Sequence, residues 1–245
     1  MLIAIGKVEM NSLIDGIKHM AGDKGKVTSQ MVDTLTNPET KAVFQTRGTC
    51  HQDGWGIAYF KDNEFEIKKS TDSILIDKNV EKLKNIKTNQ VMLHARYQTI
   101  GEKSLKNTQP FKHGKFLFCH NGTIKKEIQY DKEKFLHDVE TDSEKLFYSI
   151  LSKLPELSIP EAIRKTFQDI DKKPNSNIIL SSREKTYIYS SSRTIPNYMR
   201  MQIGTKEDLL IVSSEILPQL NLSWQDVLFD RVIVIDNKTL TVTIE

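Results

Sequence analysis

The chain has 245 residues, of which 27% are charged and 38% are hydrophobic. This composition is typical of a globular protein and excludes a largely disordered chain. The 35 lysines and arginines nearly balance the 32 aspartates and glutamates, so the formal net charge of +3 does not indicate nucleic-acid binding.

The length and the cysteine content predict a single cytoplasmic domain. A chain of this size can bury one substantial core, and we expect one domain over residues 1–245. Two cysteines cannot form a disulfide framework, which favours reduced thiols and a cytoplasmic location. No stretch contains the roughly 18 apolar residues that a membrane helix needs, and residues 1–5 are too short for a signal peptide. We therefore expect no membrane partner.

The first half of the chain predicts a series of short strands. The chain starts with an apolar run that Gly6 closes, and Leu13, Ile17 and Met20 follow at helical spacing. An aromatic-rich segment further along is typical of a hairpin that turns at Asn63-Glu64. The strands predicted in this half are residues 2–5, 55–60, 65–67, 91–96 and 115–120.

The second half predicts two helices and then further strands. The helices are expected over residues 143–151 and 159–170, with Pro155 between them and Pro160 in the first turn of the second. Strand blocks on either side of a helical pair favour an α+β fold of two packed sheets with helices outside. The later strands are predicted at residues 177–181, 186–190, 209–213, 231–235 and 240–244.

The Asn121-Gly122 pair follows a predicted strand and has two interpretations. It is a strong signal for a type I′ hairpin turn, because both central residues of that turn require positive φ. Alternatively, the Asn121 amide and the Gly122 backbone N–H point into one pocket. There they would donate hydrogen bonds to an oxygen that becomes negative during acyl transfer.

Arg96 ends a predicted strand, and Thr99 lies three residues further on, at the start of a loop. An isolated arginine is often a surface ion-pair partner. At a strand end, however, a guanidinium can bind a carboxylate through two parallel hydrogen bonds, and a threonine hydroxyl can add a third. Two neighbouring strands that end at the same edge would bring Arg96 and Asn121 to one site.

Asp142 lies at the predicted start of a helix. Thr141 and Glu144 have the spacing of a capping box, so Asp142 is either part of the helix cap or a carboxylate that faces the pocket. In the second case it can bind an ammonium group. Arg96 and Asp142 would then form a receptor for the α-carboxylate and the α-amine of an amino acid.

The histidines show no spacing typical of metal ligands, such as two histidines on one helical face. We therefore expect no metal site and no cofactor. The histidines considered are His51, His94, His113 and His120.

The ordered set of motifs resembles the class II glutamine amidotransferases, a branch of the N-terminal nucleophile hydrolases. Each motif is weak alone, but together they follow the family's order and approximate spacing over nearly the whole chain. The chain is most similar to the compact, stand-alone members. The motifs are residues 51–59, His94-Ala95-Arg96 with Thr99 and Gly101, residues 109–111, His120-Asn121-Gly122, residues 141–144 and residues 212–215.

The resemblance implies a four-layer αββα sandwich and a role for each candidate site residue. Arg96 and Thr99 would bind the α-carboxylate of glutamine, and Asp142 would bind its α-amine. Asn121 and Gly122 would form the oxyanion hole. Each of these roles agrees with the chemistry of the residues themselves.

The nucleophile is the point at which this chain departs from the family. In the family it is a cysteine exposed by removal of the initiator methionine, and its own α-amine can serve as the base. Here the aligned position is Leu2, which has no lone pair for attack. Cys119 is expected to be a buried, inert thiol that points away from its neighbour His120, and Cys50 has no evident base partner.

Two functions therefore stay open. The first is a catalytically silent domain, a pseudoenzyme, that binds glutamine, a γ-glutamyl small molecule or a protein partner in a binding or regulatory role. The second is an active amidotransferase or amidohydrolase that releases ammonia from glutamine, through an unidentified nucleophile or from a different N-terminus. Leu2 favours the first.

Overall fold

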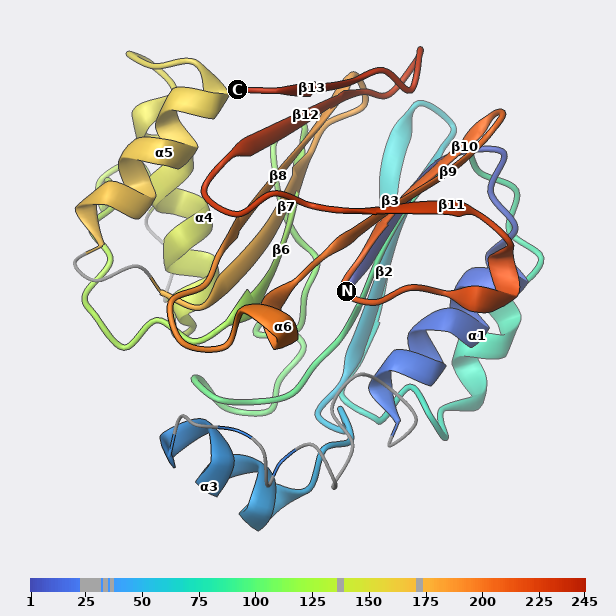
Figure 1. Ribbon diagram of the computed structural model, residues 1–245, viewed down its shortest axis with the longest axis horizontal. Coiled ribbons are helices and arrows are strands. Elements are labelled where there is room, and N and C mark those ends of the chain that lie inside the picture. Colours follow the sequence, from blue (N-terminus) through green and yellow to red (C-terminus); the bar gives the residue numbers. More distant parts are fainter. Residues whose placement is uncertain (23–31, 33–34, 36–37, 136–138, 171–173) are drawn as a thin grey trace.

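Two antiparallel sheets stack face to face at the centre of the molecule, and helices cover their outer faces (Figure 1). The computed structural model describes residues 1–22, 32, 35, 38–135, 139–170 and 174–245. The layers run from α1 (Met10–Ala21) through the two sheets to α4 (Asp142–Lys153) and α5 (Ile159–Asp169). The predicted four-layer α+β sandwich is confirmed.

The first sheet has seven strands with β1 at its centre. Leu2 on β1 lies opposite Ser213 on one neighbouring strand and Leu93 on the other. Across the sheet the order is β11 (Ser223–Asp226), β9 (Gln202–Lys206), β10 (Leu209–Ser213), β1 (Leu2–Gly6), β4 (Gln90–Ala95), β2 (Trp55–Lys61) and β3 (Glu64–Ser70).

The second sheet has six strands, and its two middle strands, β8 and β7, are joined by a tight turn. Across this sheet the order is β13 (Val242–Ile244), β12 (Val232–Asp236), β8 (Lys185–Ser191), β7 (Ser176–Ser181), β6 (Phe116–Gly122) and β5 (Phe111–His113). Other helical elements among the described residues include α3 (Pro38–Arg47), α6 (Pro196–Met199) and the short 3-10 helices η1 (Lys78–Leu83) and η2 (Pro218–Leu220). Of the helices described, none has the length and apolarity to cross a membrane.

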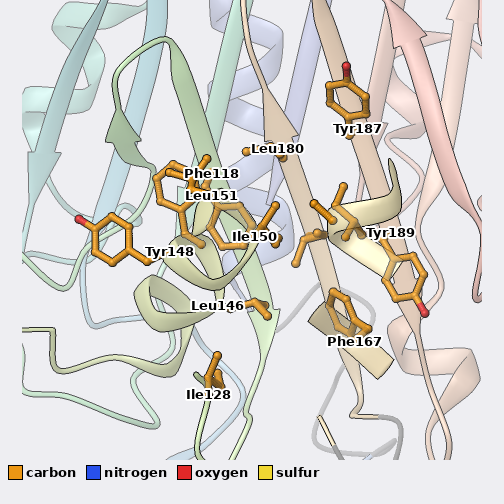
Figure 2. Close-up of a cluster of buried hydrophobic side chains, with 14 of the residues drawn as sticks. Phe118, Ile128, Leu146, Tyr148, Ile150, Leu151, Phe167, Leu180, Tyr187 and Tyr189 are labelled. Atoms are coloured by element: carbon orange, nitrogen blue, oxygen red, sulfur yellow. The ribbon is translucent and has the colours of Figure 1, made fainter. Parts of the chain in front are cut away.

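Strand alternation distributes apolar side chains among three hydrophobic layers. On β6, Leu117 and Cys119 face the space between the two sheets, whereas Phe118 faces α4. Phe118 stacks on Phe147 of α4 with ring centroids 5.0 Å apart. Figure 2 shows Phe118 in the same buried cluster as Ile150 and Leu151 of this helix. Leu2 lies in the third layer, between the first sheet and α1. The helix that carries Asp142 is thus fixed to the second sheet by buried aromatic contacts.

Local sequence signals explain most of the element boundaries. The predicted hairpin is formed by β2 and β3, but its turn lies at Asp62 and Asn63, one residue before the predicted Asn63-Glu64. These two residues have φ of 49° and 66°. Helix α5 begins with the reciprocal capping box of Ser158 and Glu161.

The hairpin-turn interpretation of Asn121-Gly122 was wrong. Both residues belong to the end of β6, where Asn121 lies opposite Asn177 and Gly122 lies opposite Ser176 of β7. Because β7 returns from a distant part of the chain and pairs with this segment, the local preference of the Asn-Gly pair for a turn is overridden.

Candidate functional site

A cavity of about 830 Å³ is lined by all five residues that the sequence predicted for the site, together with others. The ends of β4 and β6 and the start of α4 bring residues from both sheets and one helix to its wall. The predicted residues in its lining are Arg96, Thr99, Asn121, Gly122 and Asp142.

Arg96 is held by the loop that follows it. Its guanidinium donates hydrogen bonds to the backbone oxygens of Ile100, Gly101 and Glu102 at 3.3, 3.2 and 3.1 Å. Burial lowers the pKa of Arg96 from its ordinary value, but that value is so high that the side chain stays charged at neutral pH. These contacts use three of its five N–H hydrogens and orient the charge within the cavity wall.

Gly101 makes this carbonyl loop possible. It has φ of +75°, and a Cβ atom added there would lie 2.9 Å from Thr141 Cγ2 and 3.0 Å from Asn107 Nδ2. A side chain at this position would therefore strain the backbone and press on neighbouring residues. Glycine lets the loop turn back and present its oxygens to Arg96.

Asp142 faces inward from the first turn of α4. The cap itself is made by Thr141, whose hydroxyl accepts a hydrogen bond from the backbone N–H of Glu144 at 3.2 Å. The Asp142 carboxylate instead accepts the backbone N–H of Ile124 at 2.7 Å through Oδ2, and the residue is 6% exposed. The helix cap and the inward carboxylate are therefore supplied by two adjacent residues.

Asn121 bridges the two sheets with its side-chain amide. Its Oδ1 accepts from His94 Nε2 at 3.1 Å, and its Nδ2 donates to Ser214 Oγ at 3.0 Å. The proton on His94 is therefore at Nε2, which leaves Nδ1 as an acceptor, and this atom is buried with no hydrogen-bond partner among the described residues. The amide that was predicted to donate to an oxyanion is thus oriented by its own oxygen.

Gly122 follows with φ of +136°, and a Cβ atom at this position would lie 2.3 Å from the backbone oxygen of Asn175. Because that neighbour is backbone, it cannot move aside as a flexible side chain can. Only glycine fits this conformation and this close approach.

The start of the chain lies at the same cavity. The Met1 α-amine donates to Ser214 Oγ at 3.0 Å, and Ser214 Oγ donates to the Met1 backbone oxygen at 3.1 Å. Burial lowers the pKa of this amine to about 6, and the nearby Cys119 and Glu215 partly oppose the shift. Ser214 therefore joins Met1 on the first sheet to Asn121 on the second.

Leu2 and the two thiols lie outside this cavity lining. Leu2 is fully buried in the layer under α1, and strand alternation gives the place in the cavity wall to Met1. Cys119 is fully buried between the sheets, and burial raises its pKa to about 12. Cys50 is partly exposed, and it too is absent from the lining. No thiol therefore faces the candidate site in the part of the chain that the structure describes.

Sequence reasoning missed the roles of Ser214 and His51. Ser214 belongs to the motif at residues 212–215, but the motif alone predicts no contact for its hydroxyl. His51 Nδ1 donates to the Ala95 backbone oxygen at 2.9 Å, and burial lowers the pKa of His51 to about 4. Both contacts join segments far apart in the chain, and no local pattern indicates such pairs.

The cavity also has an apolar wall that the sequence did not predict. Helix α3 contributes Val43 and Phe44, and α6 contributes Tyr198 and Met199. The Phe44 ring lies 5.5 Å from that of Tyr97 and 6.0 Å from that of Tyr198, measured between centroids. Apolar surface therefore continues beyond the charged pair Arg96 and Asp142.

The two-sheet sandwich and the lining of its cavity agree with the resemblance to class II glutamine amidotransferases, and comparison with known sequences supports the same family. A family model of class II glutamine amidotransferases matches residues 33–217, so the chain belongs to this family.

Its relatives include a putative glutamine amidotransferase of Haemophilus influenzae, 30% identical over 182 residues, which are 65% of this chain and 62% of that protein. The putative glutamine amidotransferase YafJ of Escherichia coli is 32% identical over 111 residues, 42% of this chain and 43% of that protein. The matched region thus spans less than two thirds of the length of each of these relatives.

Solved structures support the fold. An allosteric regulatory enzyme of purine biosynthesis aligns with all of this chain and 48% of its own at a TM-score of 0.66 and 16% identity. A glutamine aminotransferase class-II domain protein from Silicibacter pomeroyi aligns with 79% of this chain and 90% of its own, at a TM-score of 0.56 and 17% identity. At these identities the likeness concerns the architecture alone.

Proposed function

We propose that this protein binds an α-amino acid whose side chain ends in a γ-amide, namely glutamine or a γ-glutamyl compound. The observation that carries the proposal is a pair of opposite charges, Arg96 and Asp142, both nearly buried in the lining of one cavity. Buried charges are costly unless they are paired or bound by a partner of opposite sign, and an amino-acid zwitterion offers one partner to each.

Each group of the ligand has a complementary group in the cavity. An N–H hydrogen of Arg96 that the loop carbonyls leave over would bind the α-carboxylate, and the Thr99 hydroxyl in the cavity lining would be a further donor. The Asp142 Oδ1 atom would bind the α-ammonium group, since Oδ2 accepts from Ile124. The γ-carbonyl oxygen would accept from Asn121 Nδ2 and from the Gly122 backbone N–H.

The cysteine chemistry of the family is not part of this proposal. Neither Leu2 nor Met1 carries a thiol, and the two cysteines lie outside the cavity lining. A binding or regulatory role therefore requires nothing beyond the residues named above. In a regulatory role, a protein partner would bind differently to the ligand-bound and the ligand-free protein.

Isothermal titration calorimetry with L-glutamine tests the proposal. We expect Arg96→Ala to weaken binding by roughly 1.5–3 kcal/mol, the range for a charged hydrogen-bond partner. The matched control is Arg231→Ala, because Arg231 is exposed and lies outside the cavity lining. Unchanged affinity in Arg96→Ala would remove Arg96 from the site, and the absence of heat with both glutamine and glutamate would refute the receptor.

A further inference from the structure

We propose that the ligand carries an aromatic or other bulky apolar group on its γ-amide nitrogen, and that the apolar wall of the cavity is the subsite for this group. The inference rests on the proposed receptor and names its substrate class, a γ-glutamyl conjugate of an apolar amine rather than free glutamine. The apolar wall consists of Val43 and Phe44 of α3 and Tyr198 and Met199 of α6.

The cavity is larger than a free amino acid requires. Its volume of about 830 Å³ lies within the range of roughly 300–1,000 Å³ that is typical of sites for drug-sized ligands. The contacts proposed for the two charges and the γ-carbonyl of the ligand use no residue of α3 or α6, although both helices line the same cavity. A further part of the ligand would therefore lie against these helices.

Aromatic rings from three separate segments meet at this wall. The Phe44 ring of α3 lies 5.5 Å from the ring of Tyr97, which follows β4, and 6.0 Å from the ring of Tyr198 on α6, measured between centroids. The ring planes are inclined by 51° and 75°, and inclined or edge-to-face geometries are those that aromatic pairs prefer. Helices α3 and α6 lie toward the same end of the two sheets (Figure 1). An aromatic group of a ligand can add to this cluster in the same geometries.

The apolar wall adjoins the end of the receptor that would bind the γ-amide. The backbone oxygen of Met199 accepts a hydrogen bond from Asn177 Nδ2 at 2.7 Å, and Asn177 lies opposite Asn121 where β7 pairs with β6. Asn177 is 2% exposed, so this contact fixes α6 to the second sheet from within. Tyr198 and Met199 therefore lie next to the strand end that carries the proposed donors to the γ-carbonyl.

The amide nitrogen is the position of the ligand that can carry a further group. A substituent on the α-carboxylate would remove the charge that Arg96 binds, and one on the α-ammonium group would crowd its contact with Asp142. In the proposed binding mode the γ-carbonyl oxygen is engaged by Asn121 and Gly122. Substitution at the amide nitrogen leaves each of these contacts in place.

The charged side chains that α3 brings to the cavity are already paired. Glu39 pairs with Lys125 at 2.6 Å. Arg47 pairs with Asp53 at 2.7 Å, and its guanidinium carbon lies 4.7 Å from the centroid of the Tyr97 ring. Because this guanidinium already lies over the ring face, a cationic substituent would be repelled there. The charges on α3 therefore favour a neutral apolar substituent.

Calorimetric titrations with L-γ-glutamylanilide, L-glutamine and L-γ-glutamylglycine test the proposal. The anilide keeps the amino-acid part and adds a phenyl ring, whereas the glycine conjugate adds a polar, charged group at the same nitrogen. We expect the anilide to bind roughly tenfold to a hundredfold more tightly than L-glutamine, the effect of burying a phenyl group. L-γ-Glutamylglycine should show no such gain.

Substitutions in the apolar wall should reduce the preference for the anilide, expressed as the ratio of its affinity to that of L-glutamine. In Phe44→Ala this ratio should fall about threefold or more, the contribution of an aromatic contact. Gln45→Ala is the matched control and should keep the parent ratio, because Gln45 is the exposed neighbour of Phe44 and lies outside the cavity lining. Tyr198→Ala should also lower the ratio, and it covers the case in which Phe44→Ala disturbs α3.

Three results would overturn the apolar subsite while L-glutamine still binds and the receptor stands. They are an anilide that binds no more tightly than L-glutamine, a glycine conjugate that binds as tightly as the anilide, and a ratio that neither Phe44→Ala nor Tyr198→Ala changes. Anilide affinity that is unaltered in Arg96→Ala would also overturn it, because the ring would then bind apart from the receptor. Absence of binding by all three ligands would refute the receptor and the subsite together.

Discussion

The two ends of the cavity differ in how far they keep the chemistry of the family. At one end, Arg96 and Asp142 are charged, nearly buried and held by backbone contacts. At the other end, the positions at the start of the chain are the apolar Met1 and Leu2. In the proposed function, the residues that bind the ligand are therefore separate from the position of the family's nucleophile. One set can match a family while the other departs from it.

Asp142 at the receptor end is carried by α4, which packs on the second sheet, so damage to the core shared by α4 and this sheet is expected to have the largest effect. We expect Phe118→Ala to lower the free energy of unfolding by about 3–5 kcal/mol, because Phe118 is fully buried and stacks on Phe147. Guanidinium denaturation checks this value. The exposed Leu228 supplies the control, and Leu228→Ala should change stability by less than about 0.5 kcal/mol.

Phe118→Ala should affect the two ends of the cavity differently. A looser α4 displaces Asp142, whereas the Met1–Ser214 contact lies on the first sheet and should persist. Glutamine affinity should therefore fall in the folded protein. Unchanged affinity would show that recognition does not depend on the position of α4.

The N-terminal end should respond to pH. The pKa of His51 is about 4 in the folded protein and about 6.5 when unfolded, so the unfolded chain binds a proton first as the pH falls. The contribution of His51 to stability should therefore be full above pH 6.5 and be lost between pH 6.5 and 4. The full shift corresponds to about 3 kcal/mol, and partial exposure of His51 reduces our expectation to roughly 2 kcal/mol.

Denaturation at a series of pH values checks this dependence, with His51→Asn as the comparison. The asparagine amide can still donate to the Ala95 oxygen but does not titrate. The variant should have a shallower slope between pH 6.5 and 4. Identical slopes would assign the acid sensitivity to other groups.

The smallest expected effect is on stability, and it distinguishes the role of Thr141 as helix cap from that of the neighbouring Asp142 carboxylate. Thr141→Ala removes the hydroxyl that accepts from Glu144 and should cost about 1 kcal/mol of stability, as measured by thermal or chemical denaturation. Thr141→Ser keeps the hydroxyl and should be close to neutral. Because Asp142 is held separately by Ile124, glutamine affinity should change little in either variant. A large loss of affinity in both would mean that Thr141 itself contacts the ligand.

The fold could be predicted from the sequence wherever the patterns were local. The central helices and the hairpin of β2 and β3 follow from periodicity, caps and turn residues, although the turn lies one residue before the predicted Asn63-Glu64. Helix α3 was not predicted, since its apolar residues form no clear stripe on one face. The short strands β5, β9 and β11 were also missed, because strands of three to five residues depend on their neighbours in the sheet.

The candidate site divides in a similar way. Arg96 and Asp142 could be predicted because a strand end and a helix start mark their positions in the sequence. Ser214 could not, because its contact with Met1 joins residues 213 positions apart. The place of Met1 in the cavity wall likewise follows from which face of β1 meets the second sheet, which only the packed structure defines.

Calorimetric titration with the two enantiomers of glutamine tests the receptor most directly. In D-glutamine the α-carboxylate and the α-ammonium group exchange places when the side chain keeps its position, so Arg96 and Asp142 cannot both meet the group of opposite charge. L-glutamine should therefore bind at least about tenfold more tightly than D-glutamine, a difference of about 1.4 kcal/mol. Equal affinities for the two enantiomers, or no binding of either, would contradict the account.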